Sequence, residues 1–271
     1  MQRKILIIDD HDDLASALTE VFVHSGHELT VLESREDALA IENLEDFDVV
    51  ITDLDVTPAS ATNKVSKGMC LPDMPEVESD EHVKAFKLCA ANFRRDGFNE
   101  AELKDLVATV LDYKIRFVDK PEYVRALREN IEFELPTTIA MMHIVLEYLL
   151  KRVEKLSVCK PEQSNLFVAL DEAFVNAVKH GNKFDTNKVV RVKAEISRKE
   201  VKFIIEDEGE GFDVNSIPDP LNPENLFKTS GRGVLFIYNI MDEVVYNDRG
   251  NRVTMVKKSG EYSIPPGVED L

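Results

Sequence analysis

Three polar residues between positions 170 and 182 have the spacing of one face of a helix. Glu172, Asn176 and His180 stand four residues apart, so on a helix their side chains lie in one row. Apolar residues fill much of the remaining surface and can pack against a sheet: Ala169, Leu170, Ala173, Ala177 and Val178. A carboxylate, an amide and an imidazole in one row can bind a ligand. The solvated face of an amphipathic helix gives the same pattern.

A carboxylate and two glycines follow the predicted strand 201–205. Asp207 is followed by Gly209 and Gly211, and glycine lets the backbone approach a planar ligand closely. A buried carboxylate here can accept a hydrogen bond from the exocyclic amine of adenine. A pair of tight turns also explains these glycines.

A third group begins a predicted helix after residue 230. Gly231 and Gly233 flank Arg232, and the amino terminus of a helix is a favourable place for phosphate. Arg232 can pair with a terminal phosphate or remain solvated, and Thr229 and Ser230 are within reach of the same group. This pattern predicts a phosphate-binding turn.

Together the three groups predict a nucleotide site. The amide oxygen of Asn176 is a suitable ligand for Mg²⁺ among phosphates. Glu172, one turn earlier, can position or deprotonate a nucleophile. Each motif has a simpler structural explanation by itself, but their joint occurrence in this order favours ATP binding.

The elements expected to position these groups are helices and antiparallel strands. The apolar spacing predicts helices over 137–156 and 162–179, and strands over 189–196, 201–205, 244–246 and 253–256. A further strand is expected at 131–136. These elements occupy the second half of the chain.

Residues 131–258 resemble the GHKL (Bergerat-fold) ATPase domain, and within it the anti-sigma-factor serine kinases. The resemblance implies an α+β sandwich over 131–271, a mixed sheet with helices on one face. It implies that Glu172 is the catalytic carboxylate, that Asn176 binds Mg²⁺ and that Asp207 contacts the adenine amino group.

The same resemblance assigns the glycines. Gly209 and Gly211 would shape the base pocket, and Gly231 and Gly233 would bind phosphates beneath a lid. His180 lies where lid and nucleotide would meet. We expect no phosphorylatable histidine of the histidine-kinase type, because His143 in the predicted helix 137–156 is followed by Ile144 and not by an acidic residue.

The first half places acids at the ends of predicted strands. Strands are expected at 5–8, 29–32 and 49–52, with helices at 14–22 and 36–44 between them, a pattern typical of a parallel sheet. Asp9, Asp10 and Asp53 would then converge at one sheet edge and bind Mg²⁺. Helix capping is the alternative role for such acids.

This half, residues 1–130, resembles the receiver domain of two-component response regulators, an α/β doubly wound parallel sheet. The resemblance implies that Asp53 accepts a phosphoryl group from an upstream histidine kinase in a phosphorelay. A strand is expected at 114–118, and Lys120 after it would contact the phosphoryl group.

The resemblance is incomplete between Asp53 and Lys120. Residues 57–81 are rich in Pro and Ser where a third helix is expected. Residues 83–91 are the candidate for the fourth strand, although their pattern also fits a helix. No Ser or Thr occurs from 80 to 108, where receivers place a hydroxyl. Asp53 is therefore either a phosphoacceptor or part of a docking surface.

Bulk properties limit the class of protein. The net charge of −18 argues against a nucleic-acid-binding surface. The longest apolar stretch, 138–150, is too short to span a bilayer, and the three distant cysteines indicate a cytoplasmic protein without a disulfide framework.

We therefore expect a response regulator whose output domain uses ATP and Mg²⁺ to phosphorylate Ser or Thr on an anti-sigma antagonist. The alternative is a non-catalytic ATP-binding module that sequesters a sigma factor or another regulator. A short helix is expected at 122–129, and no flexible linker is visible at the boundary near residue 130, which favours direct coupling. Kinases of this kind are often homodimers, which is our expectation.

Overall fold

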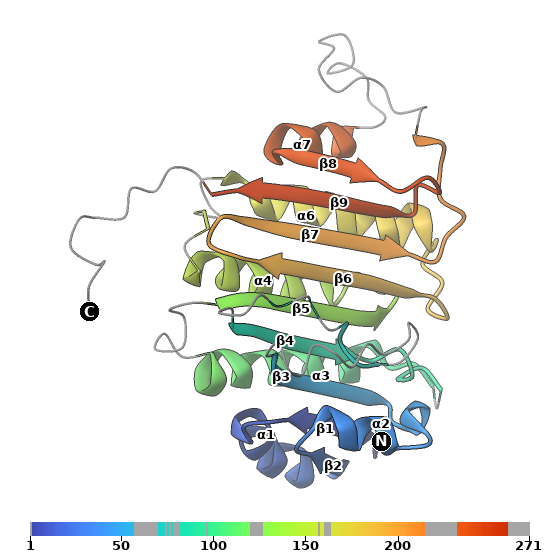
Figure 1. Ribbon diagram of the computed structural model, residues 1–271. Helices are drawn as coiled ribbons and strands as arrows, with labels where there is room; N and C mark the ends of the chain where they lie inside the picture. Colours follow the sequence, from blue (N-terminus) through green and yellow to red (C-terminus); the bar gives the residue numbers. More distant parts are fainter. Residues whose placement is uncertain are drawn as a thin grey trace, which may run out of the picture.

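The computed structural model describes residues 2–56, 70–73, 75, 77, 82–95, 97–119, 127–156, 158–159, 164–214 and 232–259. Within them, nine strands form a single sheet in the order β2-β1-β3-β4-β5-β6-β7-β9-β8 (Figure 1). The strands are β1 (Lys4–Asp9), β2 (Glu28–Leu32), β3 (Val49–Val56), β4 (His82–Cys89), β5 (Leu127–Pro136), β6 (Val189–Ile196), β7 (Glu200–Asp207), β8 (Glu243–Tyr246) and β9 (Arg252–Lys258).

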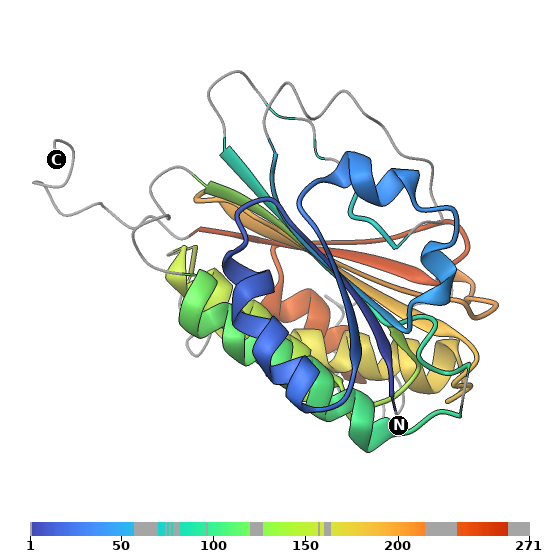
Figure 2. The ribbon, with the colours of Figure 1, turned by 90° about the horizontal axis from the view of Figure 1, so that it is seen from below.

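Most helices cover one face of this sheet. Figure 2 shows α1, α3, α4 and α6 on the same side, with α2 on the opposite side. The helices are α1 (Asp13–His24), α2 (Arg35–Ala40), α3 (Glu100–Tyr113), α4 (Met142–Lys155), α6 (Leu166–Val175) and α7 (Arg232–Ile240), with a 3₁₀ turn η1 (Leu44–Asp46) and π-helical segments η3 (Lys114–Val118) and η5 (Asn176–Gly181). In the described part of the chain no helix combines the length and apolarity needed to cross a membrane.

The sheet is mixed rather than parallel in its first half. β1 pairs in parallel with β2 and β3, as predicted, and the strand predicted at 83–91 is present as β4. However, β4 runs antiparallel to β3, so the expectation of a doubly wound parallel sheet is wrong here. Antiparallel neighbours need no crossover helix, which fits the lack of a helical pattern in residues 57–81.

Two predicted elements near the boundary are also wrong. Residues 114–118 are not a strand but continue α3 as η3, because no helix-breaking residue separates them from it. Leu127 to Glu129, predicted as the end of a helix, open β5 instead, where Leu127 pairs with His82 of β4. Lys120 lies outside the described residues.

β5 joins the two halves of the chain. It pairs in parallel with β4 on one side and antiparallel with β6 on the other, so the boundary predicted near residue 130 falls inside a shared strand. Phe86 of β4, Phe133 of β5 and Tyr148 of α4 form a triangle of rings with centroids 6.0 to 6.1 Å apart. One continuous hydrophobic core therefore includes side chains from both halves.

Cys70 and Cys89 form a disulfide, contrary to the expectation of unpaired cysteines. Their Cα atoms lie 5.5 Å apart although 19 positions separate them in the sequence. The adjacent Leu71 is buried with α2 residues, and its carbonyl oxygen accepts a hydrogen bond from Lys87 Nζ at 3.1 Å. The pairing could not be predicted from spacing, because it depends on how residues 70–73 fold back across β4.

The shared core predicts that both halves unfold together. Urea unfolding followed by circular dichroism should show one transition, and Phe86→Ala should lower the free energy of unfolding by about 3–5 kcal/mol while keeping a single transition. Two separate transitions, with Phe86→Ala affecting only the first, would contradict a common core.

Candidate functional site

The predicted polar row lies at the junction of α6 and η5. Asn176 and His180 line a cavity of about 260 Å³, and Glu172 lies one turn earlier, close to Gly233 at the start of α7. The helix changes from α to π geometry at Asn176, which the sequence pattern did not predict. Single π turns within helices are rare and are frequent at functional sites.

The cavity has a mostly apolar wall with a few polar groups. Its other lining residues come from α6, η5, β7, β8, β9, α7 and the turns between them: Ala173, Ala177, Gly181, Ile205, Asp207, Gly211, Phe212, Val234, Tyr246, Gly250, Asn251, Arg252 and Val253. Ala173 and Ala177 keep the helix side of the cavity open because their side chains are short. A cavity of this composition is suited to a planar ligand with polar edges.

Asp207 supplies the carboxylate of this cavity. It is 8% exposed at the end of β7, and its Oδ1 accepts a hydrogen bond from the amide of Gly209 at 2.7 Å. Burial raises the pKa of the Asp207 carboxyl above its usual value. Asn251 fixes the backbone, since its Nδ2 donates to the carbonyl oxygen of Asp207 at 2.6 Å. Asp207 is thus held in place to accept a hydrogen bond from a ligand.

Two glycines are required for the turn after Asp207. A Cβ atom at Gly209 would overlap the carbonyl oxygen of Gly181, so the two backbones approach closely only without side chains. Gly211 has φ +77°, and a Cβ atom there would overlap the carbonyl oxygen of Arg249. Gly211 therefore forms part of the cavity wall, and Gly209 allows the close contact behind it with Gly181.

Aromatic side chains near the cavity were not predicted. Phe212 and Tyr246 both line it, and their ring centroids lie 5.3 Å apart in an edge-to-face arrangement. Aromatic faces are favourable surfaces for a planar base. The alternation of β8, which turns Val244 and Tyr246 to the same side, was the available signal for Tyr246.

Asn182 connects the two parts of the site. It is fully buried, its Nδ2 donates to Thr137 Oγ1 and to the carbonyl oxygen of Val189, both at 2.8 Å, and its Oδ1 accepts from the amide of Glu208 at 2.7 Å. These bonds tie the end of η5 to the turn that carries Asp207. Asn182 therefore holds these backbone segments together. Its position two residues after His180 in the sequence gives no indication of this role.

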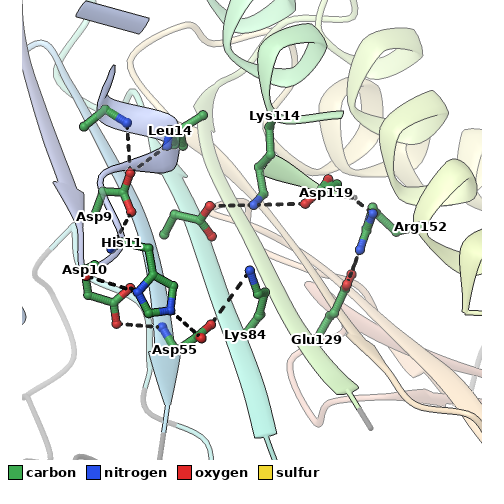
Figure 3. Close-up of polar contacts among 12 residues, drawn as sticks. Asp9, Asp10, His11, Leu14, Asp55, Lys84, Lys114, Asp119, Glu129 and Arg152 are labelled. Carbon is green, nitrogen blue, oxygen red and sulfur yellow. Dashed lines mark hydrogen bonds and ion pairs between the residues drawn. The ribbon is translucent and has the colours of Figure 1, made fainter. Parts of the chain in front are cut away.

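The acids of the first half are partly used by the backbone (Figure 3). Asp9 accepts hydrogen bonds from the amides of Leu14 and Ala15 at 2.7 and 2.8 Å, so it caps α1. Asp10 accepts from the amide of Asp55 at 2.9 Å. Within the ranges described above, no three His, Cys, Asp or Glu side chains are grouped as a metal cluster. Mg²⁺ binding by Asp9, Asp10 and Asp53 stays a prediction.

Asp53 contacts a lysine that the sequence pattern missed. Its Oδ2 accepts a hydrogen bond from Lys114 Nζ at 2.7 Å, and both side chains are buried. Lys114 continues the buried stripe of α3, which includes Val107 and Val110. A lysine at a position where the stripe predicts an apolar residue indicates a buried acidic partner.

Several predicted site residues lie outside the part of the chain that the structure describes. Thr229, Ser230 and Gly231 lie outside the described residues, as does Lys120. Arg232 opens α7, but its side chain is also outside the described part. Of the two glycines in this group, Gly233 is within the described residues and lies next to the Glu172 carboxylate.

Comparison with known proteins gives this part of the chain an assignment. Residues 135–257 match the family described as "Histidine kinase-like ATPase domain". The second half is therefore a histidine kinase-like ATPase domain, and the matched range includes every element that lines the cavity.

Individual relatives agree with this match. The chain is 27% identical to "Serine-protein kinase RsbW" of Staphylococcus epidermidis over 142 residues, which cover 49% of this chain and 89% of the relative. It is 34% identical to the protein of the same name from Staphylococcus aureus (strain JH9) over 98 residues, 33% of this chain and 62% of the relative.

The glycine wall of the cavity is tested by two substitutions with similar backbone angles. Gly211→Ala should destabilise the protein more than Gly26→Ala. Both substitutions force alanine into the left-handed region, which costs about 1–2 kcal/mol. Only the Cβ atom at position 211 would also overlap a carbonyl group. Gly26 has φ +80° and open space around it, so it is the matched control. Equal losses of unfolding free energy in urea would contradict the close approach.

Proposed function

We propose that the chain is an ATP-dependent protein serine/threonine kinase of the anti-sigma-factor type, whose activity is controlled by its N-terminal half. The observation that carries this proposal is the cavity that combines Asp207, Gly211 and Asn176 inside a histidine kinase-like ATPase domain. The name of the relatives, serine-protein kinase, supports the choice of reaction.

The proposed function gives ATP one orientation in the cavity. The adenine would lie against Phe212 and Tyr246, and its amino group would donate to Asp207. The phosphates would extend toward the amino terminus of α7, where Gly233 lies and where the helix dipole favours negative charge. Asn176 would hold Mg²⁺ through its amide oxygen.

In this proposal Glu172 would assist transfer of the terminal phosphoryl group. Its carboxylate lies beside Gly233, on the side of the cavity where the phosphates would lie. The hydroxyl oxygen of a partner's serine or threonine would form the new bond to the γ-phosphorus as the bond to the bridging oxygen of ADP breaks. Glu172 would take the hydroxyl proton, and alignment and charge neutralisation would supply most of the acceleration.

The partner class follows from the resemblance to anti-sigma-factor kinases. The substrate would be an anti-sigma antagonist, and a sigma factor would be a second binding partner. For a homodimer, both edges of β5 are already paired, so a second copy that extended the described sheet would use its outer strands β2 or β8.

For the N-terminal half, we infer that Asp53 accepts a phosphoryl group from an upstream histidine kinase. Asp53 lines a small cavity together with Asp10, His11 and Lys84, which gives a donor a place to approach. Lys114, rather than Lys120, would contact the phosphoryl group, because its ammonium group already lies 2.7 Å from the Asp53 carboxylate.

The kinase proposal predicts separate roles for two residues. With MgATP labelled at the γ-phosphate and a cognate antagonist, Glu172→Ala should lower phosphoryl transfer about a hundredfold or more while ATP still binds. Asn176→Ala should weaken Mg²⁺-dependent ATP binding itself. Glu147→Ala, which removes an exposed acid of α4, is the matched control and should transfer normally.

Two results of this assay would contradict the proposal. Transfer that survives Glu172→Ala removes the catalytic assignment. Tight ATP binding without transfer, together with retention of a sigma factor by the wild-type chain, supports the non-catalytic sequestering module instead.

The phosphoacceptor proposal is tested with acetyl phosphate and Mg²⁺. The Asp53 carboxylate oxygen would attack phosphorus and release acetate, so intact-mass spectrometry should show one added phosphoryl group. Asp53→Asn should abolish the gain and Lys114→Met should reduce it, whereas Asp105→Asn, a change of an exposed acid on α3, should not. A gain that persists in Asp53→Asn would assign the phosphoryl group elsewhere, and no gain in the wild type would make this half a docking surface.

A further inference from the structure

A row of buried charges leads from Asp53 toward helix α4. Figure 3 shows its part from Lys114 through Asp119 and Arg152 to Glu129. Lys114 Nζ lies 2.7 Å from Asp53 Oδ2 and 3.2 Å from Asp119 Oδ1, so one ammonium group is shared by two acids. Arg152 of α4 lies 3.3 Å from the other carboxylate oxygen of Asp119. All four side chains are almost completely buried.

The row ends at Glu129 on β5. Arg152 Nε donates to Glu129 Oε2 at 2.9 Å, and a second guanidinium nitrogen of Arg152 contacts Glu129 Oε1. Tyr148, also on α4, donates its hydroxyl to Asp119 Oδ2 at 3.3 Å. From Asp53 to Glu129 the charges therefore alternate in sign, and Arg152 brings α4 of the second half of the chain into the row.

In such a row, a change of charge at one residue affects the positions of the neighbouring side chains. A buried charge that loses its partner is strongly destabilised, so each member depends on both of its neighbours. Burial works against the charged form of Lys114, yet Asp119 and Asp53 hold its pKa above the usual value. A phosphoryl group on Asp53 would add negative charge and draw Lys114 away from Asp119. The negative charge of Asp119 would then be balanced by Arg152 alone among the cations of this row.

Helix α4 is in a position to pass this change to the cavity. It packs against α6, which carries Glu172 and leads directly into Asn176. The buried side chains Leu146 and Leu149 of α4 belong to the same core as Ala173. A shift of α4 therefore acts on the helix that presents the polar row.

We propose that the row Asp53–Lys114–Asp119–Arg152–Glu129 transmits a change of charge at Asp53 to α4 and thereby changes the affinity of the cavity for MgATP. The proposal rests on the ATP-binding function proposed above. It makes Lys114, Asp119 and Arg152 positioning residues, because they act on the nucleotide only through α4 and α6.

The experiment compares two substitutions of acids in the same strand. Asp53→Asn removes the charge at one end of the row, whereas Asp55→Asn removes an acid that contacts His11 and Lys84 and is outside the row. Each is made in the wild-type chain and in Asp119→Asn. The latter cuts the row in the middle but leaves Lys114 with Asp53 and Arg152 with Glu129.

The first readout is the dissociation constant of MgATP, measured by calorimetry. Asp53→Asn should change it by about fivefold or more in the wild-type chain and leave it unchanged in Asp119→Asn. Asp55→Asn should not change it in either chain. An equal shift from Asp53→Asn in both chains, or no shift at all, overturns the transmission.

The second readout needs no nucleotide. Amide hydrogen exchange in α4 should be faster in Asp53→Asn than in Asp55→Asn, and Asp119→Asn should remove that difference. If the wild-type chain fails to bind MgATP, the proposed function fails, while exchange still decides whether α4 responds to Asp53. Equal amide hydrogen exchange of α4 in Asp53→Asn and Asp55→Asn would overturn the proposed transmission.

A third variant covers the case in which Asp53→Asn does not fold. Arg152→Lys keeps the positive charge but shortens the group that spans Asp119 and Glu129. Coupling is reciprocal, so Arg152→Lys should speed exchange in η3, which contains Lys114. Unchanged amide hydrogen exchange in η3 would contradict the proposed coupling between Arg152 and Lys114.

Discussion

The parallel pairing of β4 with β5 is the constraint on which the rest of this structure depends. It runs from His82 opposite Leu127 to Cys89 opposite Glu134, and it places the first half of the chain along the edge of the ATPase domain. Without this ladder, the sheet would end at β5, and the aromatic cluster of Phe86, Phe133 and Tyr148 would be divided between two bodies. The two halves are therefore joined by packed side chains and shared backbone hydrogen bonds, which is the route that the proposed signal from Asp53 would take.

The cavity depends on a second close contact, between the end of η5 and the turn after β7. Asn182 holds these segments together by hydrogen bonds, and Gly209 lets them approach. Asp207 is fixed between them, buried and supported by Asn251. The site is preformed by backbone geometry, so a planar ligand with an exocyclic amine would meet a carboxylate that is already oriented.

Much of the second half was predictable, because its motifs are local. The row of Asn176 and His180, the carboxylate of Asp207 and the strands β6 and β7 follow from periodicity and from glycine chemistry. The π turn of η5 was not predictable, since its apolar pattern is the same as that of an α-helix. Phe212 and Tyr246 come from separate segments that only the sheet brings together.

The first half was less predictable because its important contacts are distant in the sequence. Lys114 is 61 positions from Asp53, and a short segment that alternates in character was interpreted as a strand although it continues α3. The antiparallel direction of β4 and the Cys70–Cys89 disulfide likewise depend on the path of residues that carry no regular pattern. Local spacing identified the acids, but only the fold shows that Asp9 caps a helix.

The proposed recognition of adenine by Asp207 can be tested by nucleotide discrimination. Calorimetric titration with MgATP and MgGTP should show binding of ATP and strong rejection of GTP, because guanine presents a carbonyl oxygen where adenine presents an amino group. Asp207→Asn should weaken ATP binding and reduce the discrimination. Equal affinity for the two nucleotides, or discrimination that is unchanged in Asp207→Asn, would contradict the account.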